Sequence, residues 1–155
     1  MVYLHYKECD LFSVPDDYIL VHCISADLAM GKGIALQFEK KFGTKTHLVQ
    51  KYKTRVDRWD NDTVPGPAGE CLRDGRVLNL VTKRNYWQKP TLSTLRKALE
   101  DMRKICYVAG ITKVAMPRIG CGLDRLEWQR VYEQIESVFG LFNIEIMVCD
   151  LPISK

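Results

Sequence analysis

The sequence predicts an α/β domain of three layers, in which a mixed central sheet lies between two layers of helices. Strand-like apolar runs alternate with amphipathic helical segments along the chain, and this alternation is typical of sheets with parallel strands. An Asp74-Gly75 pair between two strand-like segments predicts a hairpin. The hairpin would supply an antiparallel part, so the expected class is α/β/α with a mixed sheet.

The bulk properties indicate one soluble domain that spans residues 1–155. A chain of 155 residues can bury enough apolar surface to fold without a disulfide or a metal ion. None of the six cysteines forms a C-x-x-C pair, and no targeting segment or membrane span is visible. We therefore expect an intracellular protein with reduced thiols, no metal and no cofactor.

The charge pattern limits the class of ligand. The formal net charge is +4, and Lys and Arg are scattered rather than gathered in one stripe. A small anionic ligand suits this balance, whereas a dedicated nucleic-acid binder usually has a basic patch.

The first half of the chain predicts two strands and two helices. A first strand is expected at the start of the chain, reaching about residue 7. A second is expected over 16–25, where the continuous apolar run is typical of a strand buried on both faces. Helical spacing follows at Ile34, Ala35, Phe38 and Phe42, with Gly43 as a C-terminal cap. A second helical stretch carries Leu48, Val49, Tyr52 and Val56. His22 lies within the second strand and is expected to be a satisfied core histidine.

The second half begins with a loop over 57–70, which has two Pro and two Gly. A hairpin over 71–83 follows, with Asp74-Gly75 as a type I′ turn. The clearest helix lies within 89–110 and ends at Gly110. A strand over 111–116, a helix over 124–139 and a last strand over 143–151 complete the pattern.

Two glycine turns, Gly31-Lys32-Gly33 and Gly120-Cys121-Gly122, each separate a strand from a helix. Glycine lets backbone N–H groups approach an anion, and the following helix adds its positive dipole end. Ligands of such sheets bind beyond the carboxyl ends of the strands, so two facing turns could hold a diphosphate. The alternative is that each pair only makes a tight turn. Neither turn is a Walker A or a complete G-x-G-x-x-G, which argues against standard NTPases and Rossmann dehydrogenases.

Three polar residues near these turns are candidates for chemistry. Asp124 follows the second turn and is either a helix N-cap, with Glu127 completing a capping box, or a carboxylate that faces the ligand. The two roles are compatible. Lys83 ends a strand and is either a solvated surface residue or a partly desolvated amine that can attack an aldehyde-equivalent carbon. Asp10 either makes a turn or accepts a hydrogen bond from a base amine.

The segments "CDLF", "HCISADLAMGKGIALQF", "LVTK" and "MPRIGCGLDRLEW" occur in this order. With them, the sequence resembles a macrodomain, most closely the branch of terminal ADP-ribose protein glycohydrolases, over about residues 3–151. The resemblance implies a macrodomain fold and ADP-ribose as the ligand. Many macrodomain hydrolases carry an Asn-rich "NAAN" stretch where this chain has "HCIS", which favours a lysine–aspartate route here. The loop over 57–70 is longer than the branch leads us to expect.

The resemblance also implies roles for individual residues. Lys83 would attack C1″ of the distal ribose and form a covalent adduct, and Asp124 would act as acid/base and help to resolve it. The implied ligand contacts are Asp10 and Leu11 at the adenine, Ser25, the loop of Gly31, Lys32, Gly33 and Ile34, the loop of Arg118, Ile119, Gly120, Cys121, Gly122 and Leu123, and Leu151 at the adenine end.

The function that follows is a glycohydrolase that removes ADP-ribose ester-linked to Glu or Asp side chains, with O-acetyl-ADP-ribose as a related substrate. Three alternatives stay open: a binding module without turnover, removal of ADP-ribose from nucleic acid, and an unrelated nucleotide-binding α/β domain. Lys83 and Asp124 favour the enzyme, because a pure reader needs neither. The expected partners are ADP-ribose and ADP-ribosylated proteins or nucleic acid, with no membrane and a monomeric state. The family's association with ADP-ribose signalling implies the nucleus, besides the cytoplasm.

Overall fold

The computed structural model describes residues 1–52, 68–122 and 124–150. Within them, six strands form one sheet in the order β1-β6-β5-β2-β4-β3. The strands are β1 (Tyr3–Glu8), β2 (Ile19–Ser25), β3 (Glu70–Asp74), β4 (Val77–Lys83), β5 (Lys113–Met116) and β6 (Glu145–Asp150). The helical segments are the 3-10 turn η1 (Leu11–Ser13), α1 (Gly33–Phe42), α2 (Thr44–Lys51), α4 (Leu92–Ala109) and α5 (Trp128–Phe139).

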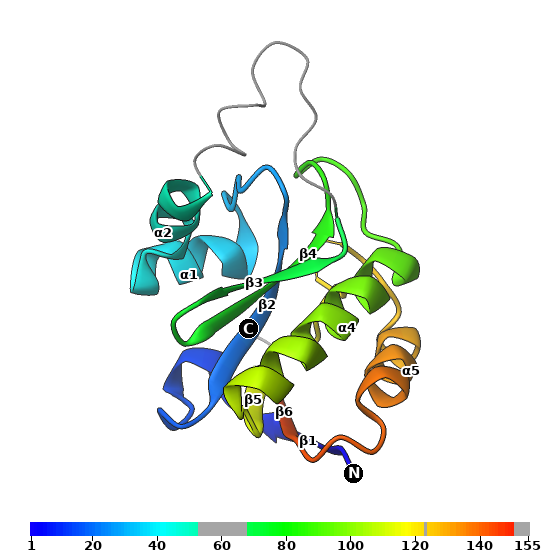
Figure 1. Cartoon of the computed structure of the whole chain (residues 1–155). Helices are drawn as coiled ribbons and strands as arrows, with labels where there is room; N and C mark the ends of the chain where they lie inside the picture. Colours follow the sequence, from blue (N-terminus) through cyan, green and yellow to red (C-terminus); the bar gives the residue numbers. More distant parts are fainter. Residues whose placement is uncertain (53–67, 123, 151–155) are drawn as a thin grey trace.

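The sheet is mixed, and helices cover both of its faces. β3 runs antiparallel to β4, whereas the other neighbouring strands are parallel. Helices α4 and α5 lie on one face and α1 and α2 on the other (Figure 1). The predicted three-layer α/β/α class is confirmed, and the hairpin supplies its antiparallel part.

Each face of the sheet has its own apolar core, because the central strands are apolar on both sides. In β4, Leu78 and Leu80 belong to the core beneath α4 and α5, and Val77 and Val81 belong to the core beneath α1 and α2. The continuous apolar run that predicted a doubly buried strand therefore fills two cores at once. The two cores hold the carboxyl ends of the central strands in fixed positions.

His22 of β2 lies in the second of these cores and is fully buried. Its ring stacks on Phe38 with centroids 3.8 Å apart, and Nε2 lies 2.6 Å from Asn79 Oδ1. Because Asn79 Nδ2 donates to the Leu72 carbonyl, Oδ1 must accept, so His22 Nε2 carries the proton. Nδ1 has no hydrogen-bond partner among the described residues. The predicted burial is confirmed, and one of the two ring nitrogens is satisfied.

The C-terminal ends of α1 and α4 follow the sequence signals. Gly43 and Gly110 adopt left-handed φ values of 66° and 69°, which confirms both as C-terminal caps. At the start of α4, Thr91 and Thr94 form a reciprocal capping box. The Thr94 hydroxyl also donates to the Thr82 carbonyl at 2.6 Å, so this cap ties α4 to the end of β4.

The hairpin forms in a different register from the predicted one. Asp74 pairs with Val77, so the two loop residues are Gly75 and Arg76. Gly75 has a φ of 55°, and Arg76 is not among the described residues with positive φ. A single positive φ at the first loop position fits a type II′ turn. The predicted type I′ turn on Asp74-Gly75 is therefore wrong by one residue.

The loop predicted over 57–70 ends one residue too late, because Glu70 already belongs to β3. Its residues 57–67 and Val56 of the predicted second helix lie outside the described residues.

The free edge of β3 is partly covered by α4. Asp101 Oδ2 accepts a hydrogen bond from the Cys71 backbone N–H at 2.7 Å. This contact joins the edge strand to the helix that packs over it.

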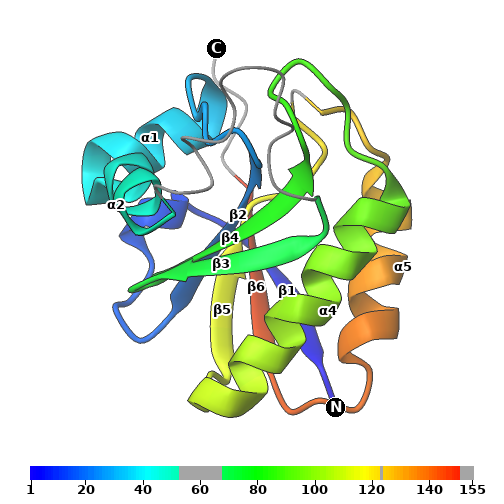
Figure 2. The same ribbon diagram turned by 45° about the horizontal axis from the view of Figure 1, so that its top comes forward.

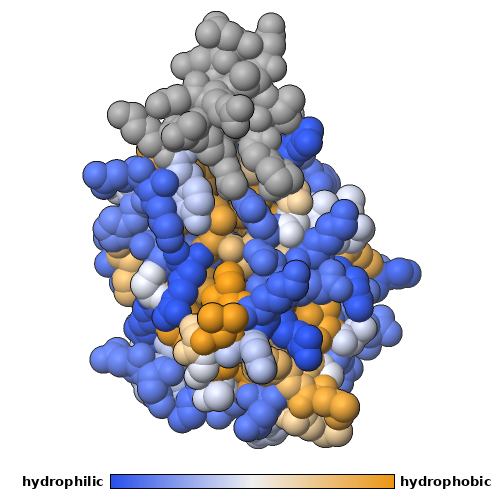
Figure 3. Space-filling model, in the orientation of Figure 1, coloured by the Kyte–Doolittle hydropathy of each residue, from blue (hydrophilic) through white to orange (hydrophobic). Residues whose placement is uncertain are grey.

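On the face shown in Figure 3, apolar side chains form small groups that hydrophilic side chains separate. Among the described residues, no helix has the length and apolar character needed to cross a membrane.

Candidate active site

The candidate site lies at the carboxyl edge of the central strands. β5, β2 and β4 are parallel neighbours, so the segments that follow them leave the sheet on the same side. These segments come forward at the top of Figure 2. Both predicted glycine turns lie at this rim, together with Lys83 at the end of β4.

Lys83 and Asp124 form a direct ion pair at this rim. Lys83 Nζ donates to Asp124 Oδ1 at 2.7 Å, and the two side chains are only 15% and 17% exposed. A charged amine so shielded from water depends on its partner, since a buried unpaired charge is costly. The surface-residue alternative for Lys83 is therefore wrong.

The end of β4 is fixed by its neighbour β2. Lys83 pairs with Ser25 after a register irregularity between Ile24 and Ser25, and the Ala26 N–H donates to the Lys83 carbonyl at 2.8 Å. The backbone that carries the amine is therefore hydrogen-bonded beyond the regular ladder, which limits where Nζ can reach.

Asp124 reaches the amine because the segment before α5 is not helical. α5 begins at Trp128, and its N-cap is Glu127, without a side-chain capping bond. Arg125 has a φ of 61°, and the Leu126 N–H donates to the Gly120 carbonyl at 2.7 Å. These features close a turn that leaves Asp124 outside the helix. The predicted N-cap role of Asp124 and the helix start at 124 are both wrong.

The two glycines of the second turn have different requirements. Gly120 has a φ of 74°, and an added Cβ would lie 2.9 Å from Leu126 Cδ1. Gly122 lacks a positive φ, and an added Cβ would have no heavy atom within 4 Å. The tight-turn explanation accounts for Gly120. It leaves Gly122 unexplained, because the fold would accept a side chain there.

The first turn is bordered by unusual backbone geometry. Leu28 and Met30 have φ values of 55° and 45° although both are buried, and such conformations are strained for non-glycine residues. Gly33 has a φ of 60° and opens α1. Of the predicted contact residues, Gly31, Lys32 and Gly33 are exposed and Ile34 is half-buried. Packing thus fixes the base of this loop, and the glycines face outward.

Asp27 is a functional candidate that the sequence interpretation missed. Its Oδ1 accepts from the Ser25 hydroxyl and from the Ala29 N–H, and its Oδ2 accepts from the Tyr86 N–H at 2.8 Å. One carboxylate therefore joins the loop after β2 to the loop after β4. Its only sequence signal is an Asp two residues beyond a strand end, which also fits an ordinary Asx turn.

The predicted adenine contacts lie after β1. Asp10 is the N-cap of η1, and its Oδ1 accepts from the Phe12 N–H at 3.0 Å. The side chains of Leu11, Ser25 and Ile119 are buried. Leu11, Ser25 and Ile119 would therefore contact a ligand mainly through their backbone groups. Leu123 and Leu151 lie outside the described residues.

Arg118 is committed to protein contacts. Its Nε and a terminal nitrogen donate to the two carboxylate oxygens of Asp150 at 2.8 and 3.0 Å. Its guanidinium also lies 5.4 and 5.5 Å from the ring centroids of Tyr6 and Trp128. The bidentate pair raises the pKa of Arg118. The backbone of this turn, rather than the guanidinium, is therefore best placed to meet an anion.

Neighbouring thiols are poor nucleophiles. Burial raises the pKa of Cys23 to about 12, with a smaller contribution from Asp124. Burial also raises the pKa of Cys121. The raised pKa values leave both cysteines protonated at neutral pH, and the thiolate is the reactive form, so Lys83 remains the candidate nucleophile at this rim.

A surface hollow of about 490 Å³ lies elsewhere, lined by Arg103, Lys104, Tyr107, Val108 and Phe142. It lies along the last turns of α4, whereas the first turn of α4 is the end tied to β4. Its lining pairs no nucleophile with an acid or base. The hollow is therefore a weaker candidate for an active site than the Lys83–Asp124 pair.

Comparison with known proteins agrees with this fold. The Macro domain family profile matches residues 21–135. The chain is 44% identical to ADP-ribose glycohydrolase OARD1 of Bos taurus over 147 residues, which cover 94% of this chain and 90% of the relative. It is 27% identical over 125 residues to DNA ADP-ribosyl glycohydrolase of Mycobacterium tuberculosis, covering 80% of this chain and 35% of that protein.

Among solved structures, the macrodomain of Thermus aquaticus DarG is similar with a TM-score of 0.77 at 22% identity, over 97% of this chain and 99% of that chain. This likeness concerns the fold. The family match spans most of the sequence, and the identity to OARD1 extends over nearly all of it. This chain therefore belongs to the macrodomain family.

Proposed function

We propose that this protein is a glycohydrolase that releases ADP-ribose from ester linkages to Glu or Asp side chains, with O-acetyl-ADP-ribose as a second substrate. The observation that carries the proposal is the shielded Lys83–Asp124 pair at the carboxyl rim. The 44% identity to a protein named ADP-ribose glycohydrolase supports the general activity. The linkage and the catalytic residues are our assignment.

The proposed first step forms a bond between Lys83 Nζ and C1″ of the distal ribose. An ammonium group cannot attack, so it must first lose a proton, and Asp124 Oδ1 at 2.7 Å is placed to accept it. As the C1″–N bond forms, the C1″–O bond breaks, and the acceptor leaves as a carboxylate. A carboxylate is a stable leaving group, so this step needs no strong acid.

The second step returns the lysine. After Asp124 has released its first proton to solvent, a water molecule attacks C1″ of the adduct with Asp124 as general base. The C1″–N bond breaks, and Asp124 passes the proton taken from the water to the amine. ADP-ribose is released with a hydroxyl at C1″. Over the cycle one water is consumed and one proton is released with the carboxylate product, and no other reactant is needed.

The proposed role of the two turns is to hold the diphosphate so that C1″ faces Nζ. The exposed segment from Gly31 to Gly33 and the open position at Gly122 leave backbone N–H groups accessible to an anion. Fixing both phosphates makes the attack effectively intramolecular, which is a large contribution to rate. The other predicted ligand contacts also remain part of this proposal, namely Asp10, Leu11, Ser25, Ile34, Arg118, Ile119, Gly120, Cys121, Leu123 and Leu151.

The reader alternative is disfavoured by the ion pair, because ADP-ribose binding alone requires neither group. The nucleic-acid alternative has one observation in its favour, namely the 27% identity to a protein named DNA ADP-ribosyl glycohydrolase. We place it second, because the chain matches only 35% of that protein.

The test is release of ADP-ribose from a peptide that carries it on a glutamate, followed by mass spectrometry. We expect release by the wild-type protein and none by Lys83→Ala, while calorimetry shows that the variant still binds ADP-ribose. Turnover by Lys83→Ala at the parent rate would refute the nucleophile. Binding without turnover in the wild type would favour the reader.

A further inference from the structure

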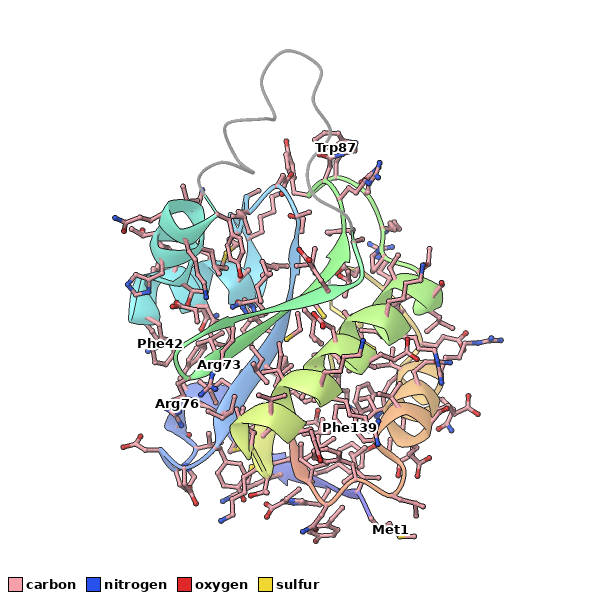
Figure 4. The ribbon with its side chains drawn as sticks, viewed as in Figure 1. Met1, Phe42, Arg73, Arg76, Trp87 and Phe139 are labelled. Atoms are coloured by element: carbon pink, nitrogen blue, oxygen red, sulfur yellow. The ribbon has the colours of Figure 1, made fainter. Side chains whose placement is uncertain are left out.

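Two exposed aromatic side chains follow the proposed catalytic lysine within four residues of the chain. Tyr86 and Trp87 are 60% and 68% exposed and follow Lys83 by three and four residues. Four residues span at most ~14 Å, so the Cα atoms of Tyr86 and Trp87 lie no farther than this from the Cα atom of Lys83. Figure 4 shows Trp87 at the top of the molecule, at the rim, with Met1 at the opposite end.

The segment that carries these rings is held by hydrogen bonds. Asp27 Oδ2 accepts from the Tyr86 N–H at 2.8 Å. Gln88 Oε1 accepts from the Asn85 N–H at 2.8 Å, and the Gln88 N–H donates to the Asn85 carbonyl. The backbone is therefore fixed while both rings remain exposed, and exposed apolar side chains that lie together can mark an interaction site.

The charges around the rings are positive. Arg84 and Lys89 border the aromatic pair, and both side chains are exposed. Within the described part of the chain, neither takes part in an ion pair, whereas the nearby carboxylates of Asp27 and Asp124 are already hydrogen-bonded. An acidic partner would find uncompensated positive charge here.

The ring geometry favours one class of acceptor. Tyr86 and Trp87 meet edge to face, with an interplanar angle of 89° and centroids 5.3 Å apart. Single-stranded nucleic acid binds by stacking successive bases on aromatic faces, and two perpendicular rings cannot continue one stack. They form a corner instead, which suits a peptide side chain or backbone. Tyr and Trp are also the residues that most often anchor protein–protein contacts.

We propose that Tyr86, Trp87, Arg84 and Lys89 form an acceptor site that binds an acidic peptide segment flanking the ADP-ribosylated residue. This inference rests on the proposed function, because it assigns the protein side of the same substrate. Tyr86 and Trp87 would act as specificity-determining residues, which do not contact the reacting atoms. ADP-ribose itself would be bound by the two turns as before.

The test compares two esters of ADP-ribose that differ only in the acceptor. One is a peptide with ADP-ribose on a glutamate flanked by acidic residues, and the other is O-acetyl-ADP-ribose, which has no peptide. We expect the double variant Tyr86→Ala/Trp87→Ala to lose at least about tenfold in kcat/KM on the peptide and to keep the parent kcat/KM on the acetyl ester. Lys89→Gln should lose about threefold on the acidic peptide and nothing on a peptide with neutral flanks.

Tyr107→Ala is the matched control, since Tyr107 is 76% exposed on the last turns of α4, away from the rim. It should leave both substrates unaffected. Equal peptide turnover by the double variant and the parent would overturn the acceptor site. A loss on an ADP-ribosylated single-stranded oligonucleotide with none on the peptide would also overturn it, in favour of a nucleic-acid acceptor. If the wild type cleaves neither ester, the proposed function fails instead.

Discussion

Lys83 and Asp124, 41 residues apart in the chain, place an amine nitrogen and a carboxylate oxygen 2.7 Å apart in a largely shielded position. β4 supplies the lysine at its last residue, and a non-helical turn before α5 supplies the aspartate. The pair exists only because the end of β4 and the segment between β5 and α5 meet at one rim.

Replacing Asp124 with Ala should separate the two chemical steps. Without Asp124 the lysine must lose its proton to water, so its attack should slow. Hydrolysis of the adduct should slow more, because the attacking water loses its proposed general base, and the covalent adduct should therefore accumulate. We expect turnover to fall about 10²- to 10⁴-fold. Intact-protein mass spectrometry after mixing with the glutamate ester should show adduct on Asp124→Ala and none on Lys83→Ala/Asp124→Ala. Free, unmodified Asp124→Ala throughout the reaction would contradict the assignment.

Substitutions at Gly120 and Gly122 should give opposite results. Gly122→Leu adds a side chain into open space, so the melting temperature should stay within about 2 °C while ADP-ribose affinity falls at least about tenfold. Gly120→Ala forces a strained φ and a contact with Leu126, and should destabilise the fold by roughly 1–2 kcal/mol. Thermal unfolding and calorimetry on both variants check this contrast. Unchanged affinity in Gly122→Leu would remove the argument for a phosphate at this turn.

Stability should fall as the pH drops below neutral because of His22. Burial lowers the pKa of this histidine to about 4, and its hydrogen bond with Asn79 offsets only part of that effect. In the unfolded chain the pKa is about 6.5, so between these values the unfolded state binds a proton that the folded state does not. This contribution is fully present above about pH 6.5 and is lost as the pH falls to about 4, amounting to roughly 3 kcal/mol.

Urea unfolding at several pH values, with His22→Gln beside the parent, measures this effect. The parent should lose more stability than the variant between pH 7 and pH 4. Parallel curves for the two proteins would show that His22 does not carry the effect.

Asp27→Ala should weaken both stability and turnover, since it removes the acceptor of three hydrogen bonds. We expect a loss of about 2 kcal/mol and a lower kcat, because the loops after β2 and β4 are no longer joined. Asp27→Asn keeps one acceptor oxygen and should lie between the parent and Asp27→Ala in both measurements. A normal kcat in Asp27→Ala would limit this residue to a structural role.

Local patterns were sufficient to predict most of the fold. The continuous apolar run of β2 and the helical spacing around Phe38 are patterns that a sequence shows directly. The caps at Gly43 and Gly110 depend on a single residue type. The hairpin register was missed because Asp74-Gly75 and Gly75-Arg76 are both acceptable turn pairs. Only the pairing of Asp74 with Val77 decides between them.

The site was harder to predict, because its distances connect remote segments. Asp124 and Glu127 have the spacing of a capping box, and nothing local reveals that the Leu126 N–H bonds to the Gly120 carbonyl instead. Asp27 was missed for a similar reason, since its contact with the Tyr86 N–H crosses 59 residues. The motifs identified the family and named the candidate residues. The structure adds which of these candidate residues are in contact with one another.

The contact between Asp101 and the Cys71 N–H has a consequence for behaviour at high concentration. An open edge strand can recruit a strand from another molecule, which begins ordered aggregation. Here the Asp101 carboxylate of α4 accepts a hydrogen bond from the Cys71 N–H of β3. An incoming strand would have to displace this carboxylate and leave its charge without that hydrogen bond. The same helix that covers the core therefore also discourages strand exchange between neighbouring molecules.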